Sequence, residues 1–318
     1  MRIHLWLPLI FFVIACNPEP TVKAPDKAIR ETLLKDSYLD HHRFFMAYPL
    51  ASGDSVRFYT DTGGGRVVYP PVAQKMNLTI DSVDVDGGYM EMLPIAGAFR
   101  ERGWPAPLQP PFVFRDSQRM DTSFDGMLGA YWFGVKRWRF DYAEGKLYRV
   151  DSIDWPALPA SHTVELGFLT DSTGQALTHF PRLEIVVDGD TISTLLDTGA
   201  KISLSDDAAT IMGQEGEVAG SFMISTLFDR WRMDHPDWRV IAGGDVHLDM
   251  DLIEVPEVTV AGHTVGPVWF ARRADANFTE YMSQWMDKPV QGAVGGSCFR
   301  HFESVVVDYV ARKAYFQR

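Results

Sequence analysis

Short stretches of alternating apolar and polar residues, separated by turn residues, recur through most of this 318-residue chain. Residues 183–187 and 191–196 flank the dipeptide Asp188-Gly189, a pattern typical of a β-hairpin with a two-residue turn. A weaker version has the turn residues Ser52-Gly53-Asp54 before a run at 55–60. The pattern predicts strands that end at residues 60 and 196.

The later part of the chain continues the same pattern. Residues 258–260 and 265–270 flank the turn dipeptide Ala261-Gly262, and residues 248–253 alternate acidic and apolar side chains as a half-buried strand does. This alternation of apolar and polar side chains at every second residue predicts a mainly β protein with few short helices.

Each of the two predicted strands runs into the same tripeptide, Asp61-Thr62-Gly63 in one case and Asp197-Thr198-Gly199 in the other. A single Asp-Thr-Gly is an ordinary turn sequence. Here, however, each copy is followed later by two apolar residues and a glycine, Met127-Leu128-Gly129 and Ala293-Val294-Gly295. The pairing predicts two related halves with one aspartate each.

The segments after these glycines also match. Phe140-Asp141-Tyr142 precedes Lys146-Leu147-Tyr148 at the same spacing as Val307-Asp308-Tyr309 precedes Lys313-Ala314-Tyr315. Internal similarity of this kind indicates a duplicated unit and a pseudo-two-fold axis.

Two aspartates brought together by such an axis have a defined chemistry. Close carboxyl groups cannot both ionise, so the pair shares one proton. The charged member can take a proton from water while the protonated member hydrogen-bonds a carbonyl. Glycine allows a tight turn and a close approach of the loops, and threonine supplies a hydroxyl that can bond the opposite loop.

On these motifs the chain resembles the pepsin–retropepsin superfamily of aspartic proteases over about residues 45–318. The resemblance implies a bilobed fold of two β-barrel-like lobes, residues 45–155 and 156–318, in a monomer. It implies that Asp61 and Asp197 are catalytic and that Thr62, Gly63, Thr198, Gly199, Gly129 and Gly295 shape the active-site loops. The implied activity is endopeptidase cleavage of a peptide or unfolded protein, with no metal or other cofactor.

The first loop departs from the family pattern. A Ser or Thr usually follows Asp-Thr-Gly in bilobed pepsins, whereas Gly64 and Ala200 stand here, and three consecutive glycines are costly to order. Thr60 is also polar where the second half has Leu196. These departures keep open an alternative function, a catalytically inactive binding lipoprotein that retains the protease fold.

Three further features have a functional and a structural interpretation. Tyr89 lies where a pepsin-like lobe carries a flap hairpin, although ordinary hairpin packing explains it as well. Residues 228–238, with two tryptophans, could line a peptide cleft or pack as an insertion on the second lobe. Cys298 lies in an apolar context that favours a buried hydrophobic residue over a nucleophile.

The N-terminus has the features of an export signal. Arg2 precedes a short apolar stretch, and Val13-Ile14-Ala15-Cys16 resembles a bacterial lipobox. The resemblance implies that Cys16 is lipidated and becomes the mature N-terminus, and residues 1–16 are assigned as the lipoprotein signal segment. Asn17 after the cysteine favours the outer over the inner membrane. The Pro-rich residues 17–25 suit a tether, and residues 26–43 fit either its continuation or one amphipathic helix, so 17–44 is assigned as a tether with a short helix.

Charge and cysteine content are consistent with this location. The net charge is −12, or −13 without the signal peptide, and such an acidic chain argues against nucleic-acid binding. Only Cys16 and Cys298 are present, so lipidation of Cys16 would leave no intramolecular disulfide. The sequence thus predicts a lipid-anchored protein of the cell envelope.

Overall fold

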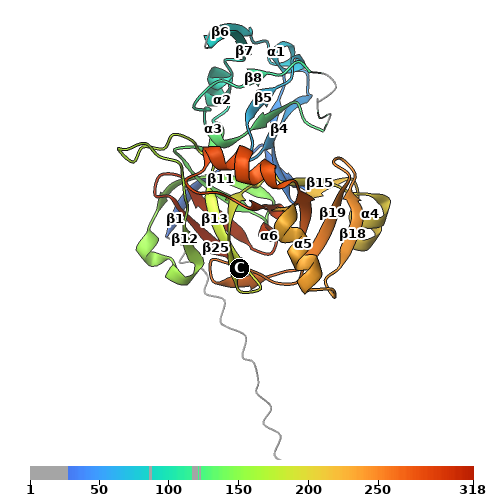
Figure 1. The fold of residues 1–318 in the computed structure, drawn as a ribbon. Coiled ribbons are helices and arrows are strands. Elements are labelled where there is room, and N and C mark those ends of the chain that lie inside the picture. The colour runs from blue at the N-terminus through green and yellow to red at the C-terminus, as the bar shows by residue number, and fades with distance from the viewer. Residues whose placement is uncertain (1–27, 86–87, 117–120, 122) are drawn as a thin grey trace, which may run out of the picture.

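The computed structural model describes residues 28–85, 88–116, 121 and 123–318. The predicted signal peptide, Cys16 and most of the predicted tether lie outside these residues. The described strands form two large sheets, one in each lobe, and a third sheet that both halves of the chain share. Figure 1 shows the N-terminal lobe as the upper part of the molecule, above the C-terminal lobe and the shared sheet.

The sheet of the N-terminal lobe has the described strand order β2-β3-β4-β9-β5-β8-β7-β6. Its strands are β2 (Ser37–Asp40), β3 (Arg43–Pro49), β4 (Ser55–Thr60), β5 (Arg66–Val68), β6 (Asp81–Val85), β7 (Gly88–Met92), β8 (Phe112–Val113) and β9 (Gly126–Leu128). Its helices are α1 (Pro71–Lys75), α2 (Ala96–Glu101) and α3 (Ala130–Phe133).

The sheet of the C-terminal lobe has the described order β18-β19-β22-β17-β23-β14-β13-β20-β21, and β15 and β16 pair separately. The strands are β13 (Arg182–Val187), β14 (Asp190–Leu196), β15 (Lys201–Ser203), β16 (Glu217–Ala219), β17 (Phe222–Ile224), β18 (Val240–Asp245), β19 (Met250–Val255), β20 (Val258–Val260), β21 (His263–Val265), β22 (Val268–Arg273) and β23 (Gly292–Val294). The α-helices are α4 (Asp206–Met212), α5 (Ser225–Asp234) and α6 (Gly296–Phe299). A short π-helix, η4 (Asn277–Tyr281), and a 3₁₀ helix, η5 (Met282–Trp285), lie between β22 and β23.

The shared sheet has the described order β1-β11-β10-β24-β25-β12. It consists of β1 (Ile29–Leu33), β10 (Arg137–Asp141), β11 (Lys146–Ile153), β12 (Thr163–Glu165), β24 (Ser304–Asp308) and β25 (Lys313–Gln317), with the turns η2 (Trp155–Ala157) and η3 (Ala160–His162) before β12. The two repeated tail segments meet at its centre, because β10 pairs antiparallel with β24 and places Arg139 opposite Val306. The duplicated ends therefore join the lobes.

The two lobes repeat one strand arrangement around their Asp-Thr-Gly loops. In the N-terminal lobe β9 lies between β4, to which it is parallel, and β5, to which it is antiparallel. In the C-terminal lobe β23 lies between β14 and β17 with the same two directions. This repetition confirms the predicted mainly β, bilobed fold.

The predicted β13–β14 hairpin is present, and its turn residues Asp188 and Gly189 both have positive φ, as a type I′ turn requires. Two strand predictions need correction. The run at 265–270 is divided into β21 and β22 by Gly266-Pro267, because proline has no N–H for a sheet bond. The run at 248–253 becomes β19 only from Met250.

Neither interpretation of residues 26–43, an amphipathic helix or a continued tether, fits the part of this segment that the structure describes. The described part of this segment forms β1 and β2 instead. β1 adds to the edge of the shared sheet by pairing with β11, where Ile29 lies opposite Ile153. A partner more than a hundred residues away thus overrides a weak local helical pattern.

Residues 228–238 belong largely to α5 and pack within the C-terminal lobe. Trp231 is buried and contacts Phe270 and Trp238 edge-on or tilted. Of the two interpretations of this segment, the structure therefore supports packing on the second lobe. Cys298 is likewise fully buried, in α6.

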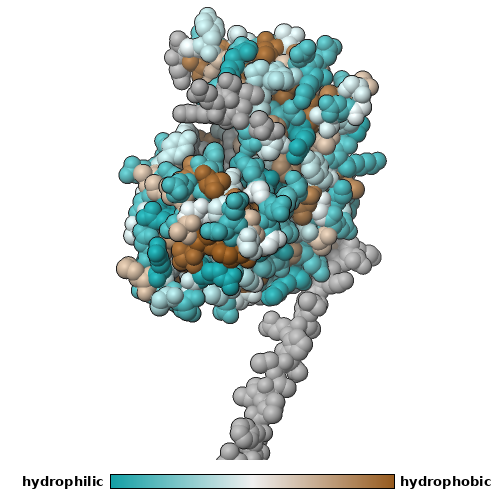
Figure 2. All heavy atoms as spheres, turned by 90° about the vertical axis from the view of Figure 1, so that its right-hand side faces the viewer, coloured by the Kyte–Doolittle hydropathy of each residue, from teal (hydrophilic) through white to brown (hydrophobic). Residues whose placement is uncertain are grey.

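The face of the molecule in Figure 2 is mostly hydrophilic, with separate hydrophobic patches on the lower part. Within the described part of the chain, no helix is both long enough and apolar enough to cross a bilayer.

Candidate active site

The structure brings Asp61 and Asp197 together where the two lobes meet. Each begins a loop directly after a central strand, β4 or β14, and each main-chain N–H is anchored to the neighbouring strand. The N–H of Asp61 donates to Leu128 at 3.1 Å, and that of Asp197 donates to Val294 at 2.8 Å. Leu128 and Val294, the residues before Gly129 and Gly295, thus hold the two aspartates in equivalent positions in their lobes.

The two carboxyl groups lie close enough for each to shift the pKa of the other, and Asp61 and Asp197 are each only 8% exposed. Each also accepts a bond from the glycine of its own motif. The Gly63 N–H donates to Asp61 Oδ1 at 2.9 Å, and the Gly199 N–H donates to Asp197 Oδ1 at 3.1 Å. The carboxyl groups are therefore fixed in position before any substrate binds.

The pKa values of the pair are both displaced upward. Burial raises the pKa of Asp61, while bonds from Asp197, Gly63 and Gly64 oppose that rise. Burial, the negative charge of Asp61 and the hydrogen bond with it together raise the pKa of Asp197 well above its usual range. One proton on the pair, held by Asp197 and donated to charged Asp61, is the arrangement these causes favour.

The two threonines lock the loops to each other. The Thr198 N–H donates to Thr62 Oγ1 at 2.9 Å, and the Thr62 N–H donates to Thr198 Oγ1 at 3.2 Å. The Thr62 hydroxyl additionally donates to the carbonyl of Leu196 at 2.7 Å. These buried bonds fix the distance between the lobes at the aspartates.

The motif glycines are required by close approach. A Cβ on Gly63 would lie 2.6 Å from Cγ of Asp197, and one on Gly199 would lie 2.1 Å from Cγ of Asp61. Each loop therefore packs its backbone directly against the opposite carboxyl group.

The first loop is ordered despite its three glycines. A Cβ on Gly64 would lie 2.4 Å from Asp61 Oδ2 and 2.6 Å from the Met127 sulfur, so no serine or threonine fits here in this conformation. The Gly64 carbonyl accepts the N–H of Ala130 at 3.0 Å. Thr60, the other unusual residue, donates its hydroxyl to the carbonyl of Phe44 at 2.8 Å. Each departure from the family pattern thus has a defined packing partner.

Gly129 and Gly295 lie against the active-site loops, as expected of bracing residues. A Cβ on Gly129 would fall 1.8 Å from the Gly65 carbonyl oxygen, and one on Gly295 would fall 2.5 Å from the Asp197 carbonyl oxygen. The Gly295 N–H donates to the buried hydroxyl of Ser221 at 3.0 Å.

Tyr89 lies in the antiparallel hairpin of β6 and β7, at the position where a flap was expected. Its side chain is 83% exposed, and Figure 1 shows the hairpin at the end of the N-terminal lobe away from the C-terminal lobe. The hairpin is present, but the structure does not place Tyr89 against the aspartates.

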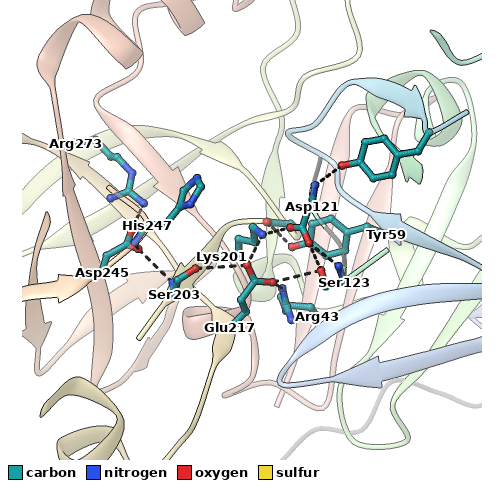
Figure 3. A network of polar contacts seen from close by, with 12 residues as sticks. Arg43, Tyr59, Asp121, Ser123, Lys201, Ser203, Glu217, Asp245, His247 and Arg273 are labelled. Carbon is teal, nitrogen blue, oxygen red and sulfur yellow. Dashed lines mark hydrogen bonds and ion pairs between the residues drawn. The ribbon is translucent and has the colours of Figure 1, made fainter. Parts of the chain in front are cut away.

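A charged network beside the second loop was missed by the sequence reasoning. Lys201 contacts Asp121 of the N-terminal lobe and Glu217 of its own lobe, the latter at 2.5 Å. Buried Arg43 reaches Glu217 at 3.1 Å, so the network joins the lobes twice (Figure 3). Lys201 lies four residues after Asp197, which was the one local signal available.

Burial alone would raise the pKa of both acids in this network. Burial is the largest single cause, but the bonds and charge of Lys201, with bonds from Ser123 to Asp121 and from Arg43 to Glu217, together outweigh it, so the pKa values of Asp121 and Glu217 lie below their usual range. Both acids are therefore charged at neutral pH. The network is an ionic contact between the lobes, distinct from the proton-sharing pair of Asp61 and Asp197.

Comparisons with solved structures find low-identity likenesses that span most of the chain. An aspartic proteinase from Irpex lacteus has a TM-score of 0.47 and 10% identity, over 91% of this chain and 97% of that one. Conglutin gamma, a basic 7S globulin from lupine seeds, has a TM-score of 0.39 and 9% identity, over 88% and 93%. Basic 7S globulin from soybean has a TM-score of 0.39 and 8% identity, over 91% and 95%.

No protein-family model and no curated protein matches the sequence. Similarity at the level of these structures assigns no activity to the chain.

Proposed function

We propose that this protein is an aspartic-type endopeptidase that hydrolyses peptides or unfolded proteins with a water activated between Asp61 and Asp197. The observation that carries the proposal is the burial of two carboxyl groups at one junction, each packed against the glycine backbone of the opposite loop, in loops of repeated geometry. Purely structural aspartates are seldom buried side by side, because two like charges cost free energy unless one is neutralised.

The different surroundings of the two carboxyls suggest their roles. Asp61, the more acidic, acts as the general base and takes a proton from the water as the water oxygen attacks the scissile carbonyl carbon. Asp197, which holds the proton, donates a hydrogen bond to the carbonyl oxygen and stabilises the charge that develops there.

The same pair completes the reaction. The tetrahedral intermediate collapses when the amide nitrogen receives a proton from Asp61 and the carbon–nitrogen bond breaks. The new carboxyl and amine termini leave, and the pair retains one proton. No atom of the protein becomes covalently bound to the substrate.

We also propose, from the lipobox-like sequence alone, that Cys16 is lipidated and anchors the enzyme in the cell envelope, on the outer rather than the inner membrane. Cys16→Ala should then abolish labelling by a fatty-acid analogue and release the protein from membranes. Recovery of the wild-type protein without lipid would contradict this location.

Cleavage of a peptide library by the purified protein tests the enzymatic proposal. Mass spectrometry of the products from about pH 3 to about pH 8 should show a bell-shaped dependence, because the singly protonated pair is the active form. A statine-type inhibitor should block cleavage, whereas chelators and serine- or cysteine-directed reagents should not.

The alternative, a binding lipoprotein without activity, rested on the unusual residues of the first loop. Since Thr60 and Gly64 each have a defined partner, these residues no longer favour it. Absence of cleavage across the whole pH range would restore this alternative and end the enzymatic proposal.

A further inference from the structure

Tyr59 makes a contact across the lobes that the reaction scheme above does not use. It precedes Asp61 by two residues on β4, and its side chain is 1% exposed. Its hydroxyl donates to the carbonyl oxygen of Gly199, in the opposite active-site loop, at 2.5 Å. An N-terminal-lobe side chain thus holds the backbone of the C-terminal-lobe loop.

The phenol is fixed as a rigid donor. Its ring packs against Phe45 and Phe124 with centroid separations of 5.1 and 5.4 Å, and the Arg43 guanidinium lies 5.7 Å from its centre. Burial and the nearby negative charge of Asp61 raise the pKa of Tyr59 well above its usual range. The hydroxyl therefore keeps its proton at every pH at which the protein would work.

Gly199 is the residue whose position matters to both carboxyl groups. Its N–H donates to Asp197 Oδ1 at 3.1 Å, and its Cα is so near Asp61 that an added Cβ would lie 2.1 Å from Cγ. A small displacement of Gly199 would weaken the first contact and relax the second. The Tyr59 hydroxyl is bonded to the carbonyl of this same residue.

The equivalent position of the C-terminal lobe offers no such donor. The residue two positions before Asp197 is Leu195, whose side chain has no donor to offer the first loop. The first loop is instead packed tightly by Gly64 against Met127. The second loop has Ala200 at the position of Gly64, and the Ala200 carbonyl accepts the N–H of Gly220 in its own lobe at 2.7 Å, so the Tyr59 bond adds a support from the other lobe.

We propose that Tyr59 is a positioning residue that holds Gly199, and through it both carboxyl groups, in the geometry required for hydrolysis. The inference rests on the proposed peptidase function and extends it to a residue outside the Asp-Thr-Gly motifs. Because Tyr59 is enclosed beneath the loops, it acts on the chemical step and not on substrate binding.

Tyr59→Phe removes only the hydroxyl and tests the inference with a matched control. Tyr69 lies in the same aromatic cluster, 5.7 Å from the Phe124 ring, and its hydroxyl accepts the N–H of Asp121 at 2.9 Å. Tyr69→Phe therefore deletes a comparable hydroxyl whose bond goes to the backbone of Asp121 and not to either Asp-Thr-Gly loop.

Loss of one buried hydrogen bond from the reacting geometry should lower kcat by about tenfold in Tyr59→Phe, with KM within about twofold of wild type. The alkaline limb of the pH profile should move upward, because a loosened Gly199 N–H no longer lowers the pKa of Asp197. Tyr69→Phe should leave kcat and the pH profile unchanged. Unchanged kcat and pH profile in folded Tyr59→Phe would overturn the inference, as would an effect confined to KM.

Two further measurements test the role of Tyr59 even if the protein is not a peptidase or if Tyr59→Phe does not fold. If wild-type protein cleaves nothing, the proposed function fails, and a carboxyl-carbon NMR titration still tests whether Tyr59→Phe, unlike Tyr69→Phe, raises the upper pKa of the pair. If Tyr59→Phe does not fold, 3-fluorotyrosine at position 59 keeps the packing and makes the donor more acidic. It should change kcat by about twofold or more at constant KM, and identical kcat would refute the positioning role.

Discussion

The two active-site loops share their first three residues and achieve the same carboxyl placement by different means. The threonine bonds join the two loops, but their other supports differ. The first loop continues as Gly64-Gly65 and packs Gly64 against Met127 of its own lobe. The second continues as Ala200-Lys201. Its Ala200 carbonyl accepts the Gly220 N–H of its own lobe at 2.7 Å, and its Gly199 carbonyl accepts the Tyr59 hydroxyl of the other lobe. Pseudo-symmetry therefore fixes the reacting atoms but not the residues that support them.

The packing of the first loop explains why its three consecutive glycines do not mean that the site is disrupted. Three consecutive glycines suggest disorder when only the local sequence is considered. In the folded protein two of them lie against carboxyl groups that leave no room for a side chain, and only Gly65 faces open space. The glycines are thus a consequence of packing two loops and two carboxyl groups into one junction.

The largest effect is expected from adding a methyl group where the loops cross. In Gly199→Ala the new Cβ would overlap Cγ of Asp61 at 2.1 Å, and the required shift of roughly 1 Å should lower activity by about 10²-fold. Overpacking should also cost about 1–3 kcal/mol of unfolding free energy.

Gly65→Ala is the matched control, since its Cβ would have no neighbour within 4 Å. It should retain activity and gain about 0.4–1 kcal/mol, because alanine restricts the unfolded chain. Equal losses in Gly199→Ala and Gly65→Ala would show that the loops are not packed as described.

Replacing the two threonines should lower the free energy of unfolding by an intermediate amount, and by more for Thr62 than for Thr198. Thr62→Val leaves two buried groups without a partner, the N–H of Thr198 and the carbonyl of Leu196. Thr198→Val deprives only the Thr62 N–H of the partner seen in the structure. At about 1–3 kcal/mol per unsatisfied group, urea unfolding should find Thr62→Val the less stable variant. The reverse order would contradict the asymmetry.

The smallest expected effect is a pH-dependent gain in stability on replacing Asp197. A carboxyl whose pKa is higher in the folded than in the unfolded state favours folding at low pH, and this contribution is lost as pH rises through the folded pKa. Asp197→Asn should therefore melt at a higher temperature than wild type above that pH and at nearly the same temperature below the ordinary Asp range.

Asp61→Asn should show a gain of the same sign, because burial also raises the pKa of Asp61. Thermal unfolding of the three proteins at several pH values measures both effects. A wild-type protein that grows more stable relative to Asp197→Asn as pH rises would contradict the raised pKa.

Features encoded within a few residues were predictable from the sequence. The β13–β14 hairpin follows from Asp188-Gly189 between two apolar runs, and the paired aspartates follow from repeated tripeptides and their answering glycines. Once the two halves of the chain place these aspartates side by side, a shared proton follows from the repulsion of like charges.

Features that depend on distant partners were not predictable. β1 forms because residues 120 positions later supply its neighbour, and Arg43 meets Glu217 across 174 positions. Tyr59 lay beside the motif, but nothing in the sequence indicated that its hydroxyl reaches Gly199. The exposure of Tyr89 likewise depends on where its hairpin lies.

We propose that Asp61 and Asp197 work as one proton-sharing unit. The test is the rate at which wild type, Asp61→Asn, Asp197→Asn and the double variant hydrolyse one peptide that the wild type cleaves. Each single replacement should lower kcat by about 10²–10⁴-fold or more, and the double replacement should cost little beyond either single one, because residues that act as a unit are not additive. Full activity in either variant, or losses that simply multiply in the double variant, would contradict the claim.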